Sequence, residues 1–205
     1  MEPDNFYHIY NHANGKDNLF RSDENYVYFL QRYANFINPI VDTYAYCLMP
    51  NHFHFLLKIK GKEDIDKVYI NLQGLKNNLG GPDENLGGFD PKIFISKQFS
   101  NFFNSYTKSF NKVYNRKGSL FQQNFKRKEV KEESYFAKII HYIHTNPVHH
   151  GFVSNIEDWN YSSYNTLLSN KTTLLKRIET LDWFNGRDQF ILYHKQPIDL
   201  KMDLE

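Results

Sequence analysis

The chain has 205 residues, of which 40% are hydrophobic and 23% charged, enough apolar material for one folded domain with a substantial core. The formal net charge is only +2, so any surface for nucleic acid must come from local clusters of basic residues. A single cysteine, Cys47, excludes an intramolecular disulfide and a cysteine-rich zinc site. Because no apolar run approaches membrane-spanning length and the N-terminus lacks a signal-peptide pattern, we expect a cytoplasmic protein without a membrane segment.

The first part of the chain predicts strands that alternate with a helix. Alternating apolar and polar residues predict the strands, and a Pro-Asn turn joins the second and third strands as an antiparallel hairpin. Ser22 is a suitable N-cap, and the apolar residues that follow it recur at helical spacing. The expected elements are a strand over Phe6–His12, a helix from Ser22 to Asn38, a strand over 42–48 and a strand from His52 to about Ile59.

The third strand carries two histidines separated by one residue. Successive strand side chains point to opposite faces, so His52 and His54 share one face while Phe53 and Phe55 share the other. Two imidazoles placed in this way can both reach one divalent ion if a third ligand comes from elsewhere. In a chain with 9 histidines the pair could also be two polar residues on a solvated face. The apolar surroundings favour a central strand, on which polar side chains need partners.

The remainder of the chain is mainly helical in pattern. We expect residues 1–170 to form one domain, and residues 171–205 to be a helical extension with a tail that is loose from Gln196. The segment rich in glycine and asparagine predicts a flexible loop between two helices. The expected elements are a short helix over 63–72, a loop over 74–90, a long helix from Ile95 to Arg116, a loop and strand over 118–128, a helix over 134–146 and further helices after it.

Two groups of basic residues are candidate DNA contacts. On the long helix a stripe of aromatic residues leaves the opposite side basic, although each lysine there could equally belong to a solvated helix face. Further along, rings and cations interleave in a way that suits contacts to a polynucleotide backbone. The candidates are Lys108, Lys112, Arg116, Lys126, Arg127 and Lys128.

The helix over 134–146 carries a tyrosine and an asparagine one turn apart. Tyr142 and Asn146 lie on one face, beside the apolar stripe and not within it, so both should sit at the rim of the core. Tyr142 could be an ordinary boundary aromatic, and Asn146 could be a helix C-cap before Pro147. The spacing alone does not decide between these readings.

Four motifs follow one another along the chain: Tyr7-His8-Ile9-Tyr10-Asn11, Met49-Pro50-Asn51-His52-Phe53-His54, Gly118-Ser119-Leu120-Phe121-Gln122 and His141-Tyr142-Ile143-His144-Thr145-Asn146-Pro147. In this order they resemble those of the HUH single-tyrosine transposases, and most closely the REP-associated tyrosine transposases. The resemblance covers roughly residues 5–165, and the order of the motifs is more specific than any one of them. The fold that it implies is α+β, an antiparallel sheet with helices packed on it, of the ferredoxin-like or RNA-recognition type.

The resemblance also implies an activity and a site. His52, His54 and Asn146 would hold a divalent ion, Mg²⁺ or Mn²⁺, and Tyr142 would be the nucleophile that forms a 5′-phosphotyrosine. The enzyme would nick and join single-stranded DNA that carries hairpins, as a homodimer. The insertion 74–90 and the residues beyond about 170 depart from the family pattern, which leaves the choice of substrate open.

Two other functions remain possible from the sequence. The chain could be a DNA- or RNA-binding module with the same sheet but no catalysis. It could also be a zinc-dependent hydrolase that uses His52, His54 and an acid such as Asp42. The hydrolase reading leaves the Tyr142/Asn146 helix unexplained, and formation of a covalent protein–DNA adduct would distinguish the two enzymes.

Overall fold

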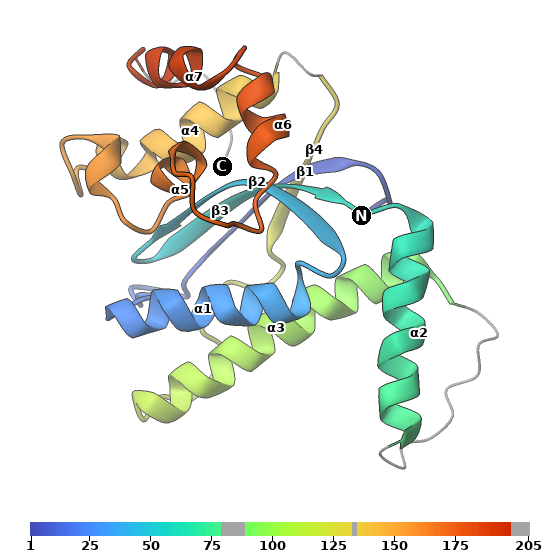
Figure 1. Cartoon of the computed structure of the whole chain (residues 1–205). Coiled ribbons are helices and arrows are strands. Elements are labelled where there is room, and N and C mark those ends of the chain that lie inside the picture. Colours follow the sequence, from blue (N-terminus) through green and yellow to red (C-terminus); the bar gives the residue numbers. More distant parts are fainter. Residues whose placement is uncertain (79–88, 133–134, 198–205) are drawn as a thin grey trace.

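The computed structural model describes residues 1–78, 89–132 and 135–197, and its centre is a four-stranded antiparallel sheet (Figure 1). The strand order β2-β3-β1-β4, with helices inserted between β1 and β2 and between β3 and β4, is the ferredoxin-like arrangement. The α+β class expected from the sequence is therefore confirmed. The strands are β1 (Phe6–His12), β2 (Val41–Met49), β3 (His52–Ile59) and β4 (Lys126–Val130).

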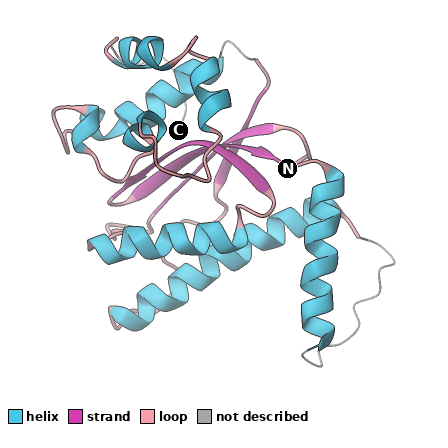
Figure 2. Ribbon diagram, in the orientation of Figure 1, coloured by secondary structure: helices cyan, strands magenta, loops and turns pink. Residues whose placement is uncertain are grey.

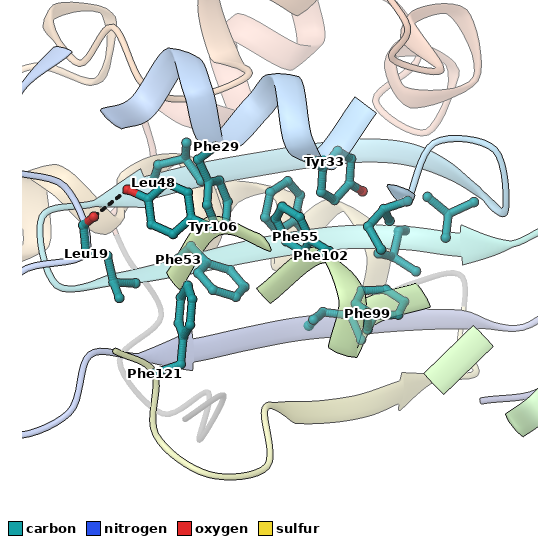
Figure 3. Close-up of a cluster of buried hydrophobic side chains, with 14 of the residues drawn as sticks. Leu19, Phe29, Tyr33, Leu48, Phe53, Phe55, Phe99, Phe102, Tyr106 and Phe121 are labelled. Atoms are coloured by element: carbon teal, nitrogen blue, oxygen red, sulfur yellow. Dashed lines mark hydrogen bonds between the residues drawn. The ribbon is translucent and has the colours of Figure 1, made fainter. Parts of the chain in front are cut away.

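Two helices, α1 (Asp23–Phe36) and α3 (Pro91–Val113), cover one face of the sheet (Figure 2). The core on this face is largely aromatic: Phe55 of β3 stacks on Tyr33, with ring centroids 4.4 Å apart (Figure 3). The hydroxyl of Tyr106 donates a hydrogen bond of 2.6 Å to the carbonyl of Leu19. Strand alternation places the phenylalanines of β3 here, so the histidines of β3 face the other side.

Five helical segments cover the opposite face of the sheet (Figure 1). Their apolar residues form a second core with Leu56 of β3, to which the C-terminal segment contributes Phe184 and Phe190. Residues 171–197, expected as an extension, thus pack on the same sheet as the rest of the chain. The segments are α4 (Phe136–His149), η2 (Ile156–Asp158), α5 (Tyr164–Leu168), α6 (Arg177–Asp182) and α7 (Arg187–His194).

Three helix boundaries differ from the expected ones. Helix α2 (Lys62–Asn78) continues into the segment expected as a loop, of which residues 79–88 lie outside the described ranges. Helix α3 begins at Pro91, because the Asp90 side chain accepts a 2.8 Å hydrogen bond from the backbone N–H of Lys92 and caps the helix. Helix α4 runs through Pro147 to His149, beyond its expected end at 146.

None of the helices within these described ranges is both long enough and apolar enough to cross a membrane.

Candidate active site

The face of the sheet beneath α4 carries a cluster of histidines. Alternate residues along a strand point to the same face of the sheet. His52 and His54 of β3 therefore point to this face, as do His8 and His12 of β1. The strand register places His12 opposite His52 and Tyr10 opposite His54. His52 and His54 are 3% and 0% exposed, so both need polar partners within the fold.

His54 meets His8 directly. Nδ1 of His54 lies 3.0 Å from Nε2 of His8, and the two rings are stacked at a centroid distance of 5.2 Å. Burial lowers the pKa of His8 to about 3, with a smaller contribution from the nearby Lys128. Burial and the neighbouring histidines also hold the pKa of His54 well below its usual value. Both imidazoles are therefore neutral near pH 7, which is the form that binds metal ions.

His52 lies between two side-chain oxygens. Its Nδ1 faces Oδ1 of Asn51 at 2.8 Å and its Nε2 faces Oδ1 of Asn146; both oxygens can only accept, so the single hydrogen of the neutral ring serves one of them. In one of the two tautomers this hydrogen is on Nδ1 and is donated to Asn51. Nε2 of His52 then presents a lone pair to Oδ1 of Asn146, 3.0 Å away. Two acceptors that converge in this way favour a cation between or beside them. The distance also fits, because adjacent ligands of an octahedral ion with bonds of about 2.1 Å lie about 3.0 Å apart.

Asn146 is the third ligand expected from the sequence, and the fold brings its Oδ1 to within 3.0 Å of His52. Among the described residues, no three His, Cys, Asp or Glu side chains form a metal-binding group. Asp42, the acid of the hydrolase alternative, pairs with Lys58 in the sheet, whereas His52 pairs with Met49 at the other end of the same two strands. The structure therefore removes the ligand set of the zinc hydrolase, and an ion here would take two imidazoles and one amide.

Helix α4 brings Tyr142 to the same place. Its ring lies edge-on to His54, with centroids 5.5 Å apart, and edge-on to His8 at 6.2 Å. Tyr142 is half-buried, as expected for a residue at the rim of the core. Asn146, in contrast, is 1% exposed, which corrects that expectation. Because α4 continues to His149, Asn146 is an interior helix residue and not the C-cap.

A chain of buried hydrogen bonds ties α4 to its neighbours. The backbone N–H of Tyr46 donates to Oγ of Ser163 (2.9 Å), which contacts Nε2 of His144 (2.7 Å). Nδ1 of His144 lies 2.9 Å from Nε2 of His194, whose Nδ1 donates to the carbonyl of Phe190 (2.8 Å). With His194 neutral, its Nε2 accepts from His144, and His144 accepts from Ser163. This Ser163–His144–His194 relay connects β2, α4 and α7, and no spacing in the sequence indicates it.

The basic residues of β4 divide between the two faces of the sheet. Lys126 pairs with Tyr10 and Lys128 with His8, so both lysines emerge on the histidine face. Arg127 pairs with Ile9 and points to the other face, where its guanidinium lies 5.9 Å from the Phe125 ring centroid. Strand β4 is at the edge of the sheet, which leaves both lysines exposed beside the site.

The basic residues of the long helix lie elsewhere. Lys108 and Lys112 are exposed on α3, which covers the face opposite the histidines (Figure 1). Arg116 follows α3 and is held within the fold: its guanidinium binds Asp17 at 2.6 Å and the carbonyl of Ser119 at 2.8 Å. The sheet thus separates these three residues from the site, and their part in DNA binding remains a prediction.

The fold and this face of the sheet define a class: a ferredoxin-like protein in which a histidine pair, an asparagine and a tyrosine meet beneath one helix. No protein-family model matches the chain. A curated protein of Haemophilus influenzae (strain ATCC 51907 / DSM 11121 / KW20 / Rd) is 25% identical over 125 residues, which are 60% of this chain and 58% of that protein. Its name assigns it provisionally to the REP-associated tyrosine transposases. The chain thus spans little more than half the length of this relative.

A solved structure of a REP-associated tyrosine transposase bound to a REP hairpin matches in fold, with a TM-score of 0.52 and 13% identity over 82% of each chain. At this identity the likeness concerns the fold alone. Together, the two comparisons confirm the resemblance to the REP-associated tyrosine transposases that the four motifs indicated.

Proposed function

We propose that this protein is a tyrosine transposase that nicks and joins single-stranded DNA next to hairpins. The observation that carries the proposal is the meeting of Tyr142 and Asn146 with His52 and His54 on one face of the sheet. The curated relative supports the same class of enzyme. The fold neighbour, which was solved with a REP hairpin, supports a DNA hairpin as part of the substrate.

His52, His54 and Asn146 would hold a divalent ion, Mg²⁺ or Mn²⁺. When bound, the ion supplies Lewis-acid chemistry at a phosphate oxygen. Three protein ligands leave positions open for such an oxygen, and the neutral ring of His54 fits this role because a protonated imidazole cannot ligate a metal.

Tyr142 provides the nucleophile in this proposal. Its Oη attacks the phosphorus of a DNA phosphodiester, the bond from phosphorus to the 3′ oxygen breaks, and that oxygen leaves as a 3′-hydroxyl. The products are a 5′-phosphotyrosine and a free 3′ end. Because the new ester keeps the energy of the phosphodiester, another 3′-hydroxyl can reverse the step and join a different strand. A phenol has a pKa near 10, so its attack depends on groups that stabilise the phenolate.

Lys126 and Lys128 would contact the DNA backbone, because they are exposed on the histidine face at the open edge of the sheet. The homodimer and the cytoplasmic location belong to the same proposal. The first follows from the resemblance, and the second from the need to reach chromosomal DNA.

The test is covalent capture of DNA. The protein is incubated with Mn²⁺ and a pool of single-stranded hairpins that have randomised flanks, labelled at either the 5′ or the 3′ end, and separated on a denaturing gel. A 5′-phosphotyrosine predicts that the 3′ label moves with the protein while the 5′ label appears on a shorter free strand. Tyr142→Phe should abolish both signals. Tyr135→Phe, seven residues earlier in the chain, is the matched control and should keep them.

An adduct that persists in Tyr142→Phe would end the assignment of the nucleophile. Hairpin binding by the unaltered protein without any adduct would favour the alternative that the protein is a non-catalytic binding module.

A further inference from the structure

His8 is a buried histidine for which the proposed chemistry has no use. It lies on β1, is 0% exposed, and contacts His54 through a 3.0 Å hydrogen bond between ring nitrogens. Its ring stacks on that of His54 with an interplanar angle of 16°, so the two imidazoles have one defined relative orientation. A phenylalanine could fill the same space. The hydrogen bond is therefore the property of His8 that needs an explanation.

The proton count of the pair restricts what His54 can bind. Each neutral imidazole has one N–H and one lone pair, so one of the two facing nitrogens donates and the other accepts. If His8 donates from Nε2, the hydrogen of His54 is on its own Nε2, and that atom cannot ligate a cation. If His54 donates from Nδ1, its Nε2 lone pair is available to an ion.

We propose that His8 is a positioning residue that accepts the Nδ1–H of His54 and thereby directs the Nε2 lone pair of His54 into the metal site. This inference rests on the proposed function and deepens it. His52 has the corresponding partner in Asn51, whose Oδ1 lies 2.8 Å from Nδ1 and accepts its hydrogen in the tautomer that keeps the lone pair on Nε2. The two candidate histidine ligands are thus each oriented by an acceptor, one from the turn before β3 and one from β1. Such acceptors typically change metal affinity by about 10- to 100-fold.

The tautomer in which His8 accepts from His54 has an energetic cost at His8 itself. When it accepts from His54, its own hydrogen is on Nδ1, a buried atom that has no hydrogen-bond partner in the described part of the chain. A buried donor without a partner is unfavourable, whereas a buried acceptor without one costs less. Both tautomers place one hydrogen on a buried outer nitrogen, Nδ1 of His8 or Nε2 of His54, so burial does not choose between them. A cation at Nε2 of His54 favours the change to the tautomer in which His8 accepts. No proton has to leave the pair for this change.

The test measures metal binding without DNA and without turnover. Mn²⁺ is titrated into the full chain and free Mn²⁺ is followed by electron paramagnetic resonance. His8→Phe keeps a stacked ring but removes the acceptor, and should weaken Mn²⁺ binding by about 10- to 100-fold. His8→Gln restores an acceptor oxygen and should stay within about threefold of the unaltered protein, a difference well below that second-sphere loss. His141→Phe, a buried histidine of α4 outside the site, is the matched control and should bind Mn²⁺ normally.

A second measurement covers a His8→Phe variant that fails to fold. Nitrogen-15 spectra of histidine-labelled, unaltered protein distinguish the tautomers, and with Mg²⁺ bound the hydrogen of His54 should be on Nδ1. Normal Mn²⁺ affinity in a folded His8→Phe variant would overturn the role proposed for His8 but not the metal site. A His54 that has its hydrogen on Nε2 with Mg²⁺ bound would do the same. Failure of the unaltered protein to bind Mn²⁺ would instead overturn the proposed metal site itself.

Discussion

Nε2 of His52 lies 3.0 Å from Oδ1 of Asn146, although 94 positions separate the two residues in the chain. The contact joins the central strand β3 to the helix α4 that carries Tyr142. A neutral His52 has one hydrogen for the side-chain oxygens of Asn51 and Asn146, so one of these two contacts lacks a donor until a cation is shared. The position of α4 on the sheet and the binding of an ion should therefore depend on each other.

Removal of the Asn146 side chain should weaken metal binding. Asn146→Ala deletes one of three proposed protein ligands, so Mn²⁺ affinity should fall by at least about tenfold, at the scale of single-residue effects on metal sites. Isothermal titration with Mn²⁺ measures this. Asn104→Ala, an exposed asparagine on α3, is the control and should bind as the unaltered protein does. Equal affinity of Asn146→Ala and the control would exclude Asn146 as a ligand.

The alternation of β4 predicts unequal roles for its three basic residues. Lys126→Ala and Lys128→Ala should each weaken binding of a single-stranded hairpin and lower the slope of affinity against salt by about one ion, because both side chains face the site. Arg127→Ala should change the slope less, because its side chain lies on the other face. Fluorescence anisotropy at several salt concentrations gives the slopes. A larger effect of Arg127 than of either lysine would place the DNA on the opposite face.

Arg116 should matter for stability more than for DNA. Its guanidinium binds Asp17 and two backbone carbonyls, and its side chain is 17% exposed. Arg116→Ala should lower the free energy of unfolding by about 1–3 kcal/mol, the usual range for a lost network of charge-assisted hydrogen bonds. Lys112→Ala, on the exposed side of α3, should stay within about 0.5 kcal/mol. Urea denaturation measures both, and normal stability with a large loss of hairpin affinity would reverse this assignment.

The relay predicts a sensitivity to acid. Burial lowers the pKa of His194 to about 3, from about 6.5 in the unfolded chain. Between these values the unfolded state binds more protons, so the free energy of unfolding decreases as the pH falls below about 6.5. The contribution is fully present above that pH. His194→Gln removes the titrating group. Between pH 7 and pH 5 the free energy of unfolding of this variant should therefore fall by about 1–2 kcal/mol less than that of the unaltered protein.

Urea denaturation at the two pH values measures the difference, and His149→Gln, an exposed histidine on α4, serves as the control. Identical pH dependence in His194→Gln and the unaltered protein would show that His194 does not titrate in this range.

Several features of the site could be predicted from the sequence because they follow from local periodicity. The period of two along β3 put His52 and His54 on one face, and the helical period put Tyr142 and Asn146 on one face. The same rule, applied to β4, would have separated Arg127 from its two lysine neighbours. That signal was present but needed the strand boundaries, which begin at Lys126.

Other features depend on contacts that leave no periodic pattern. The depth of Asn146 could not be predicted, because a proline at the next position usually marks a helix end and here α4 continues through it. The relay joins residues that are 19 and 50 positions apart, and no spacing indicates such a connection. His8 belongs to a recognised motif, yet its contact with His54 is diagonal, because the register pairs His54 with Tyr10, and only the placement of the two rings shows it.

The Ser163–His144–His194 relay also affects the order in which parts of the chain can pack during synthesis on the ribosome. A nascent chain that has emerged as far as Asn146 already contains the proposed ligands and nucleophile, but not Ser163 or His194, which hold α4 against its neighbours. Helix α7 is translated after every other element described here. Vectorial folding can therefore complete the sheet and its aromatic core early and leave α4 unsecured until residues 187–194 arrive. The proposed active site is in this way completed late, after translation has passed through residues 187–194.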